Sequence, residues 1–328
     1  MPQTIAAADP RLRWSGSISN NVTSTGVAPW RIPHDELGLY AEELVGRAAM
    51  PAGVRVSFQS NTDVLQGTCN AAPERSPIDL MIDGKLAGTE PTEDLTSFKF
   101  VGLGSQMKSF ELWLPQFGEF ELNGLSISGG AQITESDDPK LPKWITYGSS
   151  ITHCRAADSP TLTWPSIVAR AREYDLTCLG FGGQCHLDPL IARVIRDRDA
   201  DLISLCVGIN IYGNNSLNAR TFGPGIVGFV KIIREGHPNT PIALISPIYS
   251  PVREDTPNGV GFTLGSMRDE VATAVEKLRA AGDSNIHYIN GLDVLDSDNA
   301  HLLPDYLHPN SEGYGIMATN LLNLLPPV

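Results

Sequence analysis

The chain has 328 residues, of which 41% are hydrophobic and 19% are charged. This composition is that of a globular protein with a sizeable core, and the length exceeds one ordinary domain, so we expect two domains. The formal net charge of −13 argues against a nucleic acid or an anionic membrane as a partner.

The N-terminal segment, residues 1–14, has no apolar run and no small-residue cleavage site, so we expect no signal peptide. No stretch approaches the roughly 18 consecutive apolar residues of a membrane span. The five cysteines are scattered, odd in number and without a C-x-x-C spacing. They suit a reducing, cytoplasmic environment and give no metal framework.

Short alternating segments fill the first 135 residues. Apolar and polar residues alternate at 54–58, 110–114 and 119–122, as in half-buried strands. Residues 78–87 read as a hairpin, because its Asp-Gly turn tolerates the positive φ of a type I′ turn. We therefore predict a β-sandwich, jelly-roll-like domain over residues 1–135.

A polar segment with two prolines, residues 136–142, is the predicted linker. Beyond it, strand and helix patterns alternate, which predicts an α/β domain over residues 143–328, with a parallel sheet covered by helices on both faces. The predicted strands are 144–147, 176–179, 201–207, 241–245 and 286–289. The predicted helices are 163–173, 189–196, 227–235, 264–281 and 311–324. Ligands bind at the carboxyl ends of the strands in such folds.

Three segments with candidate catalytic groups follow the first three of these strands. Residues 147–152 (Tyr-Gly-Ser-Ser-Ile-Thr) offer a serine at a tight turn, although a serine there could equally cap a helix. Residues 179–184 carry three glycines, which either bring backbone amides close to a ligand or only turn the chain. Asn210 follows the third strand and could donate to an oxyanion or close an Asx-turn.

The fourth segment lies near the C-terminus, where Asp305 stands three residues before His308 and Pro309. A carboxylate at this spacing can orient an imidazole and stabilise its cation. The alternative is an acidic surface loop with an incidental histidine. All four segments fall at strand ends or just before the last helix, so they can converge on one cleft.

Together these segments resemble the SGNH hydrolases, the GDSL lipase/esterase superfamily, across residues 143–328. The resemblance implies a three-layer α/β/α fold, no metal or organic cofactor, and a catalytic serine triad. It implies Ser150 as nucleophile with Asp305 and His308, and an oxyanion hole of the Ser150 amide, Gly183 and Asn210. This sequence departs from the family pattern in having Ser149 in place of the usual Asp, and Ile211 where an Asp often follows the Asn.

The N-terminal half resembles the carbohydrate-binding-module-like β-sandwich of the two-domain SGNH family that includes a salicylyl acyltransferase of tetracycline biosynthesis. The segments that carry this resemblance are 31–33, 53–58 and 112–116. We expect this domain to wall the substrate cleft rather than to bind sugar.

Other motifs are weaker. Asp298 and His301 repeat the Asp-x-x-His spacing without a following proline, and the His-Pro-Asn run at 237–239 lacks the Asp. Residues 223–228 match G-x-G-x-x-G, but no strand precedes them. Several residues near the same sheet edge could line an acyl or acceptor pocket, although core packing is the commoner fate of such aromatics: His153, Trp164, Phe181, Tyr212, Tyr249 and Arg253.

We therefore expect a serine esterase that hydrolyses a small-molecule O-acyl ester, such as an acylated sugar or polyketide, through an acyl-enzyme. The first alternative is an acyltransferase that moves the acyl group onto a hydroxyl of a glycoside or polyketide. The second is a carbohydrate-binding protein whose catalytic domain is inactive.

Overall fold

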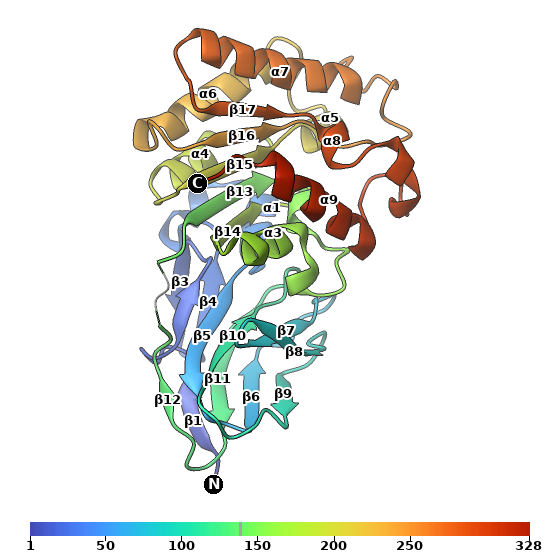
Figure 1. Cartoon of the computed structure of the whole chain (residues 1–328). Coiled ribbons are helices and arrows are strands. Elements are labelled where there is room, and N and C mark those ends of the chain that lie inside the picture. Colours follow the sequence, from blue (N-terminus) through green and yellow to red (C-terminus); the bar gives the residue numbers. More distant parts are fainter. Residues whose placement is uncertain (138–139) are drawn as a thin grey trace. The chain divides into compact units, whose positions relative to one another are not determined.

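The computed structural model describes residues 1–137 and 140–328, which form two compact units (Figure 1). The first unit contains residues 1–140 together with 158–161, and the second contains 141–157 and 162–328. The predicted linker at 136–142 includes Asp138 and Pro139, which lie outside the described residues. In those residues that are described, no helix is both long and apolar enough to cross a membrane.

The first unit is a β-sandwich of two antiparallel sheets, each with six strands among the described residues. One sheet has the order β3-β4-β11-β6-β9, with β1 beside β11. Its strands are β1 (Gln3–Ala6), β3 (Ser19–Val22), β4 (Val27–Trp30), β6 (Val64–Cys69), β9 (Ser97–Val101) and β11 (Leu122–Ile127). The other has the order β12-β5-β10-β7-β8, with β2 beside β5. Its strands are β2 (Arg13–Ser15), β5 (Arg55–Ser60), β7 (Ile78–Ile82), β8 (Lys85–Glu90), β10 (Lys108–Trp113) and β12 (Ile133–Thr134).

Alternation of side chains explains the sandwich core. Phe58 and Phe110 of one sheet stack with ring centroids 5.0 Å apart and join Leu65, Phe98 and Leu125 of the other in one buried cluster. Two short helices complete the unit, η1 (His34–Leu39) and α1 (Glu42–Ala48). The sandwich prediction is therefore confirmed.

The predicted strand at 119–122 is wrong, because β11 begins only at Leu122. The backbone before it bonds to side chains and, through the Glu121 carbonyl, to the N–H of Asn70 at 3.3 Å, without forming a ladder. Buried Arg75 donates to the Glu119 carbonyl at 3.1 Å, and the Glu121 N–H donates to Asn70 Oδ1 at 2.8 Å. Alternation of apolar and polar residues predicts which side chains face inward, but it does not predict whether the backbone N–H and C=O groups will pair with a neighbouring strand.

Residues 158–161 belong to the first unit because of one buried carboxylate. Asp79 on β7 is fully buried and accepts hydrogen bonds from the Ser159 hydroxyl at 2.6 Å and from the Thr161 hydroxyl and N–H at 2.6 and 2.9 Å. Thr89 donates to its other oxygen at 2.6 Å. Four donors satisfy the carboxylate without a paired cation, and no pattern in the sequence signals this anchor.

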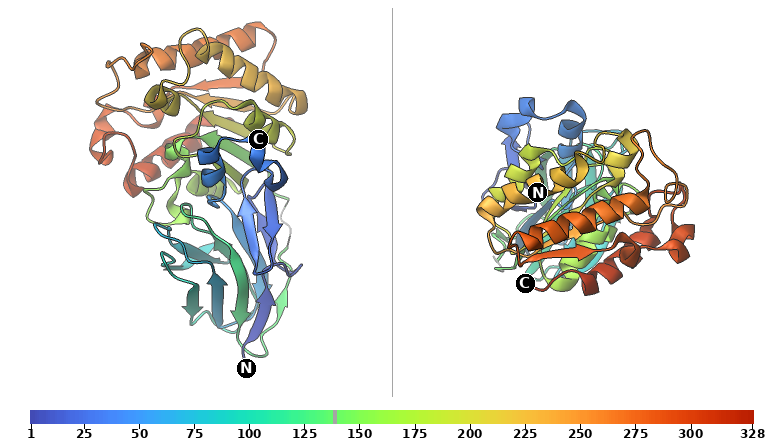
Figure 2. Two further views of the ribbon diagram at one scale, coloured as in Figure 1. Left: turned by 180° about the vertical axis from the view of Figure 1, so that it is seen from behind. Right: turned by 90° about the horizontal axis from the view of Figure 1, so that it is seen from above.

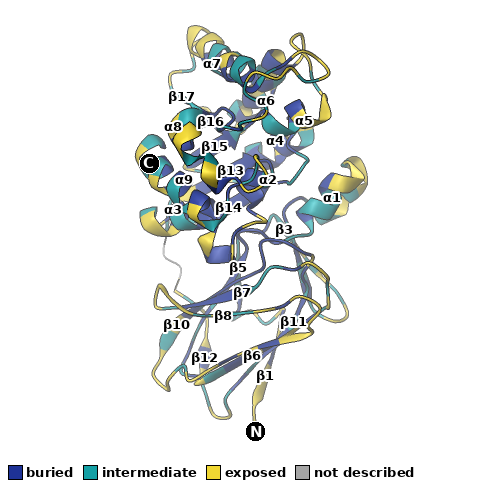
Figure 3. Cartoon of the chain, turned by 90° about the vertical axis from the view of Figure 1, so that its right-hand side faces the viewer, coloured by how far each residue is buried: buried dark blue, intermediate teal, exposed yellow. Residues whose placement is uncertain are grey.

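The second unit contains one parallel sheet in the order β14-β13-β15-β16-β17. Its strands are β13 (Lys143–Gly148), β14 (Asp175–Gly180), β15 (Leu202–Cys206), β16 (Ile242–Ile245) and β17 (Ile286–Ile289). The strands are almost entirely buried, as continuous apolar runs in a parallel sheet should be (Figure 3).

Helices cover both faces of this sheet, which confirms the predicted α/β/α class (Figure 2). The chain first moves from β13 outward to β14 and then crosses back to add β15, β16 and β17 on the other side of β13. Because crossovers between parallel strands are right-handed, this change of direction puts α3 and α9 on one face of the sheet and α4, α6 and α7 on the other. The helices of this unit are α2 (Ser150–His153), α3 (Trp164–Arg172), α4 (Pro189–Arg196), α5 (Ile209–Asn214), α6 (Phe222–Gly236), α7 (Leu264–Ala280), α8 (Gly291–Val294), η3 (Ser297–Leu302) and α9 (Ser311–Leu324). The short helix η2 (Pro160–Leu162) begins in the first unit and ends in the second.

Local sequence sets the ends of these helices. Thr163 caps α3, with Pro165 in its first turn, and Thr263 forms a reciprocal capping box with Ser266 at α7. Asn310 caps α9 by accepting from the Gly313 N–H at 2.9 Å. The G-x-G-x-x-G run lies inside α6 rather than after a strand, so it is not a nucleotide-binding loop.

Candidate active site

The carboxyl ends of β13, β14 and β15 bring the predicted catalytic segments together at one edge of the sheet. Gly148 pairs with Gly180 at the ends of β13 and β14, and α2 packs on both strands. A Cβ on Gly148 would lie 2.2 Å from Thr152 Oγ1, and one on Gly180 would lie 2.4 Å from the His153 amide nitrogen. These two glycines let the short helix that begins at Ser150 sit directly on the sheet.

Ser149 and Ser150 have different tasks. Ser149 is buried, and its hydroxyl caps α2 by accepting from the Ile151 N–H at 3.2 Å. Ser150 is half-buried, with Oγ 2.8 Å from Nε2 of His308. The serine that replaces the family's usual Asp therefore serves as a helix cap, a role that Ser and Asp fill equally well. Of the two serines, only the second is placed to lose its proton to a base.

The turn from Asp305 to His308 orients the imidazole. Asp305 Oδ2 lies 2.6 Å from His308 Nδ1, while its Oδ1 accepts from the N–H groups of Leu307 at 3.0 Å and His308 at 2.7 Å. Partial burial alone would raise the pKa of Asp305, but the hydrogen bonds from His308 outweigh it, so the net pKa lies below its usual range. The carboxylate is thus ionised and holds the proton on Nδ1, which leaves Nε2 free to accept from Ser150.

The groups predicted to bind an oxyanion follow three neighbouring strands: Ser150 begins α2, Gly183 lies in the loop after β14, and Asn210 lies in the first turn of α5. Asn210 Oδ1 accepts from the Cys185 N–H at 3.0 Å, which fixes the side-chain amide and leaves its N–H groups to face elsewhere. Gly183 has φ +77° and open space where a Cβ would stand. The Ser150 N–H is the first of α2, a position without an intrahelical acceptor. The glycine loop lies close to Ser150, because a Cβ on Gly182 would lie 3.6 Å from that of Ser150.

The sequence did not reveal the groups that hold Gly183. Its carbonyl oxygen lies 3.0 Å from Nε2 of His186 and accepts from Asn214 Nδ2 at 3.3 Å. Nδ1 of His186 is in turn 2.8 Å from the hydroxyl of Ser216. These contacts fix the peptide group between Gly183 and Gln184, next to the Gly183 N–H. A histidine three residues after a glycine loop is not a signal that a single sequence makes visible.

Three of the six predicted pocket residues are core residues instead. Trp164 and Phe181 are fully buried, and Tyr212 is nearly so. The Trp164 indole N–H donates to the Ile151 carbonyl at 2.9 Å, Phe181 packs edge-on against Tyr147, and the Tyr212 hydroxyl donates to the Thr256 carbonyl. Their positions in the sequence place these aromatics near the edge of the sheet where the candidate site lies, but their rings are buried in the core.

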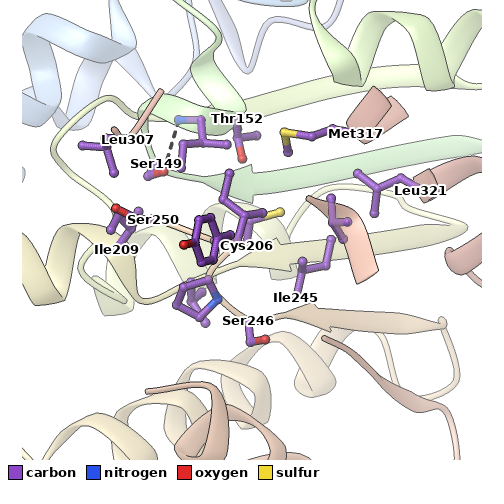
Figure 4. Close-up of a pocket in the computed structure, with 16 residues that line it drawn as sticks. Ser149, Thr152, Cys206, Ile209, Ile245, Ser246, Ser250, Leu307, Met317 and Leu321 are labelled. Carbon is purple, nitrogen blue, oxygen red and sulfur yellow. Dashed lines mark hydrogen bonds between the residues drawn. The ribbon is translucent and has the colours of Figure 1, made fainter. Parts of the chain in front are cut away.

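Of the other three, two bond to loops around the site and one lines a nearby cavity. His153 is buried, and its Nδ1 accepts from the Gly182 N–H at 3.3 Å. Arg253 donates to the Tyr306 carbonyl, within the turn that carries His308. Tyr249 is half-buried and is one of the residues that line a cavity of 30 Å³. Figure 4 shows this cavity.

That cavity is mainly apolar and lies beside the candidate catalytic groups. Ser149, Ile209 and Leu307 line it, and each is the chain neighbour of Ser150, Asn210 or His308. Met317 and Leu321 of α9 also line it (Figure 4). A cavity of this size can hold water, since one molecule needs about 10–15 Å³.

The competing motifs lie elsewhere. His301 Nδ1 contacts the backbone carbonyl of Asp298 at 3.1 Å rather than its carboxylate, and both residues are exposed. His237 is the C-cap residue of α6, and its Nε2 lies 2.9 Å from the Ile195 carbonyl of α4. Within residues 1–137 and 140–328, no group of three or more His, Cys, Asp or Glu residues is arranged to hold a metal ion.

Comparison with known protein families assigns both halves of the chain. The profile of the GDSL-like lipase/acylhydrolase family matches residues 142–325, which is more than half of the chain. The chain belongs to the GDSL-like lipase/acylhydrolase family. A second profile, the N-terminal domain of SsfX3, matches residues 12–123. Both predicted family relationships are confirmed.

Solved structures extend the relationship over the whole length of this GDSL-like protein. The salicylyl-acyltransferase SsfX3 from a tetracycline biosynthetic pathway is 36% identical, with a TM-score of 0.90 over 97% of this chain and 95% of that one. A protein from Bacteroides ovatus described as a GDSL-like lipase is 23% identical, with a TM-score of 0.82 over 97% and 95% of the two chains. A family two carbohydrate esterase from Cellvibrio japonicus is 17% identical, with a TM-score of 0.68 over 98% and 96%. The last two show a shared fold. A search among curated proteins finds no match.

Proposed function

We propose that this chain is a serine acyltransferase that carries an acyl group on Ser150 and passes it to a hydroxyl of an acceptor. The observation that carries the chemistry is the hydrogen-bonded row from Ser150 through His308 to Asp305. Similarity over nearly the whole chain to a salicylyl-acyltransferase favours transfer over hydrolysis. This reverses the order of preference expected from the sequence, where hydrolysis came first because water is always available.

The first half-reaction forms the acyl-enzyme. Ser150 Oγ attacks the ester carbonyl as its proton moves to His308 Nε2, and Asp305 stabilises the imidazolium that results. The Ser150 and Gly183 N–H groups and the Asn210 side chain donate to the developing oxyanion. His308 then gives its proton to the leaving alcohol as the C–O bond breaks, which leaves an ester on Ser150.

The second half-reaction repeats these steps in reverse with the acceptor. His308 removes the proton of an incoming hydroxyl, the new ester bond forms, and Ser150 regains its proton. We propose a ring-bearing alcohol of the polyketide or glycoside class as acceptor.

We also propose that the chain is divided into a sandwich domain at 1–135, a linker at 136–142 and a catalytic domain at 143–328.

Hydrolysis is the second candidate, and one observation favours it. The His308 and Asp305 side chains are 32% and 56% exposed, so water reaches the base directly. Water and an acceptor alcohol then compete for the same acyl-enzyme, and their partition distinguishes a transferase from an esterase.

The partition of the acyl-enzyme between water and an acceptor is measured with p-nitrophenyl acetate, butyrate and salicylate as donors. The reactions contain increasing concentrations of phenolic, polyketide and glycoside alcohols. A transferase yields the acceptor ester as the main product at millimolar acceptor, while free acid alone at every acceptor concentration would identify an esterase. Ser150→Ala should abolish p-nitrophenol release, and Ser149→Ala is the matched control that keeps the nucleophile. If a fluorophosphonate fails to label Ser150 in the wild type, the inactive binding-protein alternative replaces both.

A further inference from the structure

The turn that presents His308 contains an unfavourable backbone conformation. Tyr306 lies between the two triad residues and has φ +62°, in the left-handed region that a bulky side chain rarely adopts. The conformation is unfavourable because it brings Cβ too close to the following carbonyl oxygen. The Tyr306 side chain is 58% exposed, so its packing does not offset that strain. Other contacts must hold the turn in place.

Two side chains from a distant loop hold the carbonyl of Tyr306. The Ser250 hydroxyl donates to it at 2.7 Å, and Arg253 Nη1 donates to it at 3.2 Å. Arg253 Nη1 also donates to the Ser250 hydroxyl at 3.0 Å, so the three groups form a closed ring of hydrogen bonds. Ser250 is only 1% exposed, which protects its bond from competing water.

The loop that carries these two residues, 246–254, is itself fixed. The Ser250 N–H donates to the Glu254 carboxylate at 3.0 Å, and the Arg253 N–H donates to the Ser250 carbonyl at 2.9 Å. Glu254 is paired with Arg268 of α7, whose guanidinium also donates to the Pro247 carbonyl at 3.1 Å. The hydroxyl of Ser250 and the guanidinium of Arg253 therefore have defined positions before they meet the turn.

We propose that Ser250 and Arg253 are positioning residues that hold the Asp305–His308 turn in its working geometry. They act through the Tyr306 carbonyl and touch no reacting atom. Without them the turn can relax out of the left-handed conformation, and the bond between Asp305 and His308 loosens. The inference rests on the proposed function, because it assigns a role toward the same triad.

The experiment measures fluorophosphonate labelling of Ser150 and hydrolysis of p-nitrophenyl acetate from pH 5 to 9, in the full-length protein. A misplacement of catalytic groups by about 1 Å costs on the order of 10²-fold in rate. We expect Ser250→Ala and Arg253→Ala each to lower kcat about tenfold with little change in KM, and Arg253→Lys to recover part of the loss. The acid limb of the pH–rate profile should move to lower pH, because the imidazolium loses part of its carboxylate partner.

Ser246→Ala is the matched control, since Ser246 starts the same loop, is equally buried and accepts from the Gly291 N–H at 2.9 Å. It should lower the melting temperature as Ser250→Ala does, but keep the wild-type kcat and pH profile. A Ser250→Ala enzyme with the kcat and pH profile of Ser246→Ala would overturn the proposal, as would Arg253→Lys with no more activity than Arg253→Ala. Failure of the wild type to react with the fluorophosphonate would instead overturn the proposed function.

Discussion

Replacing Asp305 by Asn tests the triad most directly, because the change keeps the size of the side chain and removes only its charge and one acceptor. In the turn, Oδ1 accepts two backbone N–H groups while Oδ2 faces His308 Nδ1. The introduced side-chain amide will keep its oxygen toward the two N–H groups, so its NH₂ faces the imidazole. Nδ1 must then accept, the ring proton moves to Nε2, and Ser150 loses its base.

The expected magnitude follows from these bonds. Rotating the amide to restore the working tautomer gives up two backbone hydrogen bonds, each worth about 0.5–1.5 kcal/mol, and the lost bond from a carboxylate to the imidazolium is worth about 1.5–3 kcal/mol. The sum, about 2.5–6 kcal/mol, corresponds to a fall in kcat of roughly 10² to 10⁴. The upper value equals the loss of about 10⁴ seen for this exchange in another serine triad.

The assay is steady-state release of p-nitrophenol from the acetate ester, with the melting temperature measured alongside. Asp298→Asn is the control, since it makes the same exchange in the competing Asp-x-x-His pair and should leave kcat unchanged. If Asp305→Asn retains more than about one tenth of wild-type kcat, the carboxylate does not orient His308 and the triad assignment fails.

Three further outcomes are expected. Asn210→Ala should lower kcat by about 10²–10³ with little effect on KM, because one oxyanion donor is lost, and an unchanged kcat would remove Asn210 from the oxyanion hole. Asp79→Ala leaves buried hydroxyls and an N–H without their acceptor, so we expect a loss of about 3 kcal/mol in urea unfolding, and a loss below about 1 kcal/mol would contradict its anchoring role. Burial raises the pKa of Cys206 to about 12, so this thiol stays neutral at pH 8. Iodoacetamide should therefore alkylate the native protein slowly, faster as pH rises, without loss of activity, and rapid inactivation at pH 8 would point to a catalytic thiol.

Local patterns in the sequence determined the elements and their order. Period-two alternation and the Asp-Gly turn predicted the β7–β8 hairpin, where Asp83 and Gly84 both adopt positive φ. Apolar runs alternating with amphipathic segments predicted a parallel sheet, and the structure has five parallel strands that alternate with helices along the chain. Parallel strands end at one edge of a sheet, so the segments that follow them can converge there. The pairing of Ser150 with His308, 158 residues apart, came from the resemblance of these segments to the GDSL superfamily.

Tertiary structure alone decided how side chains are used at that edge. Trp164 and Phe181 follow the same positional logic as Asn210, yet their rings turn into the core, because large apolar groups gain more free energy by leaving water. The hydrogen bonds from Ser250 and Arg253 to Tyr306 join segments more than fifty residues apart. No local pattern specifies such a bond, because it depends on where two loops of the folded sheet come to lie.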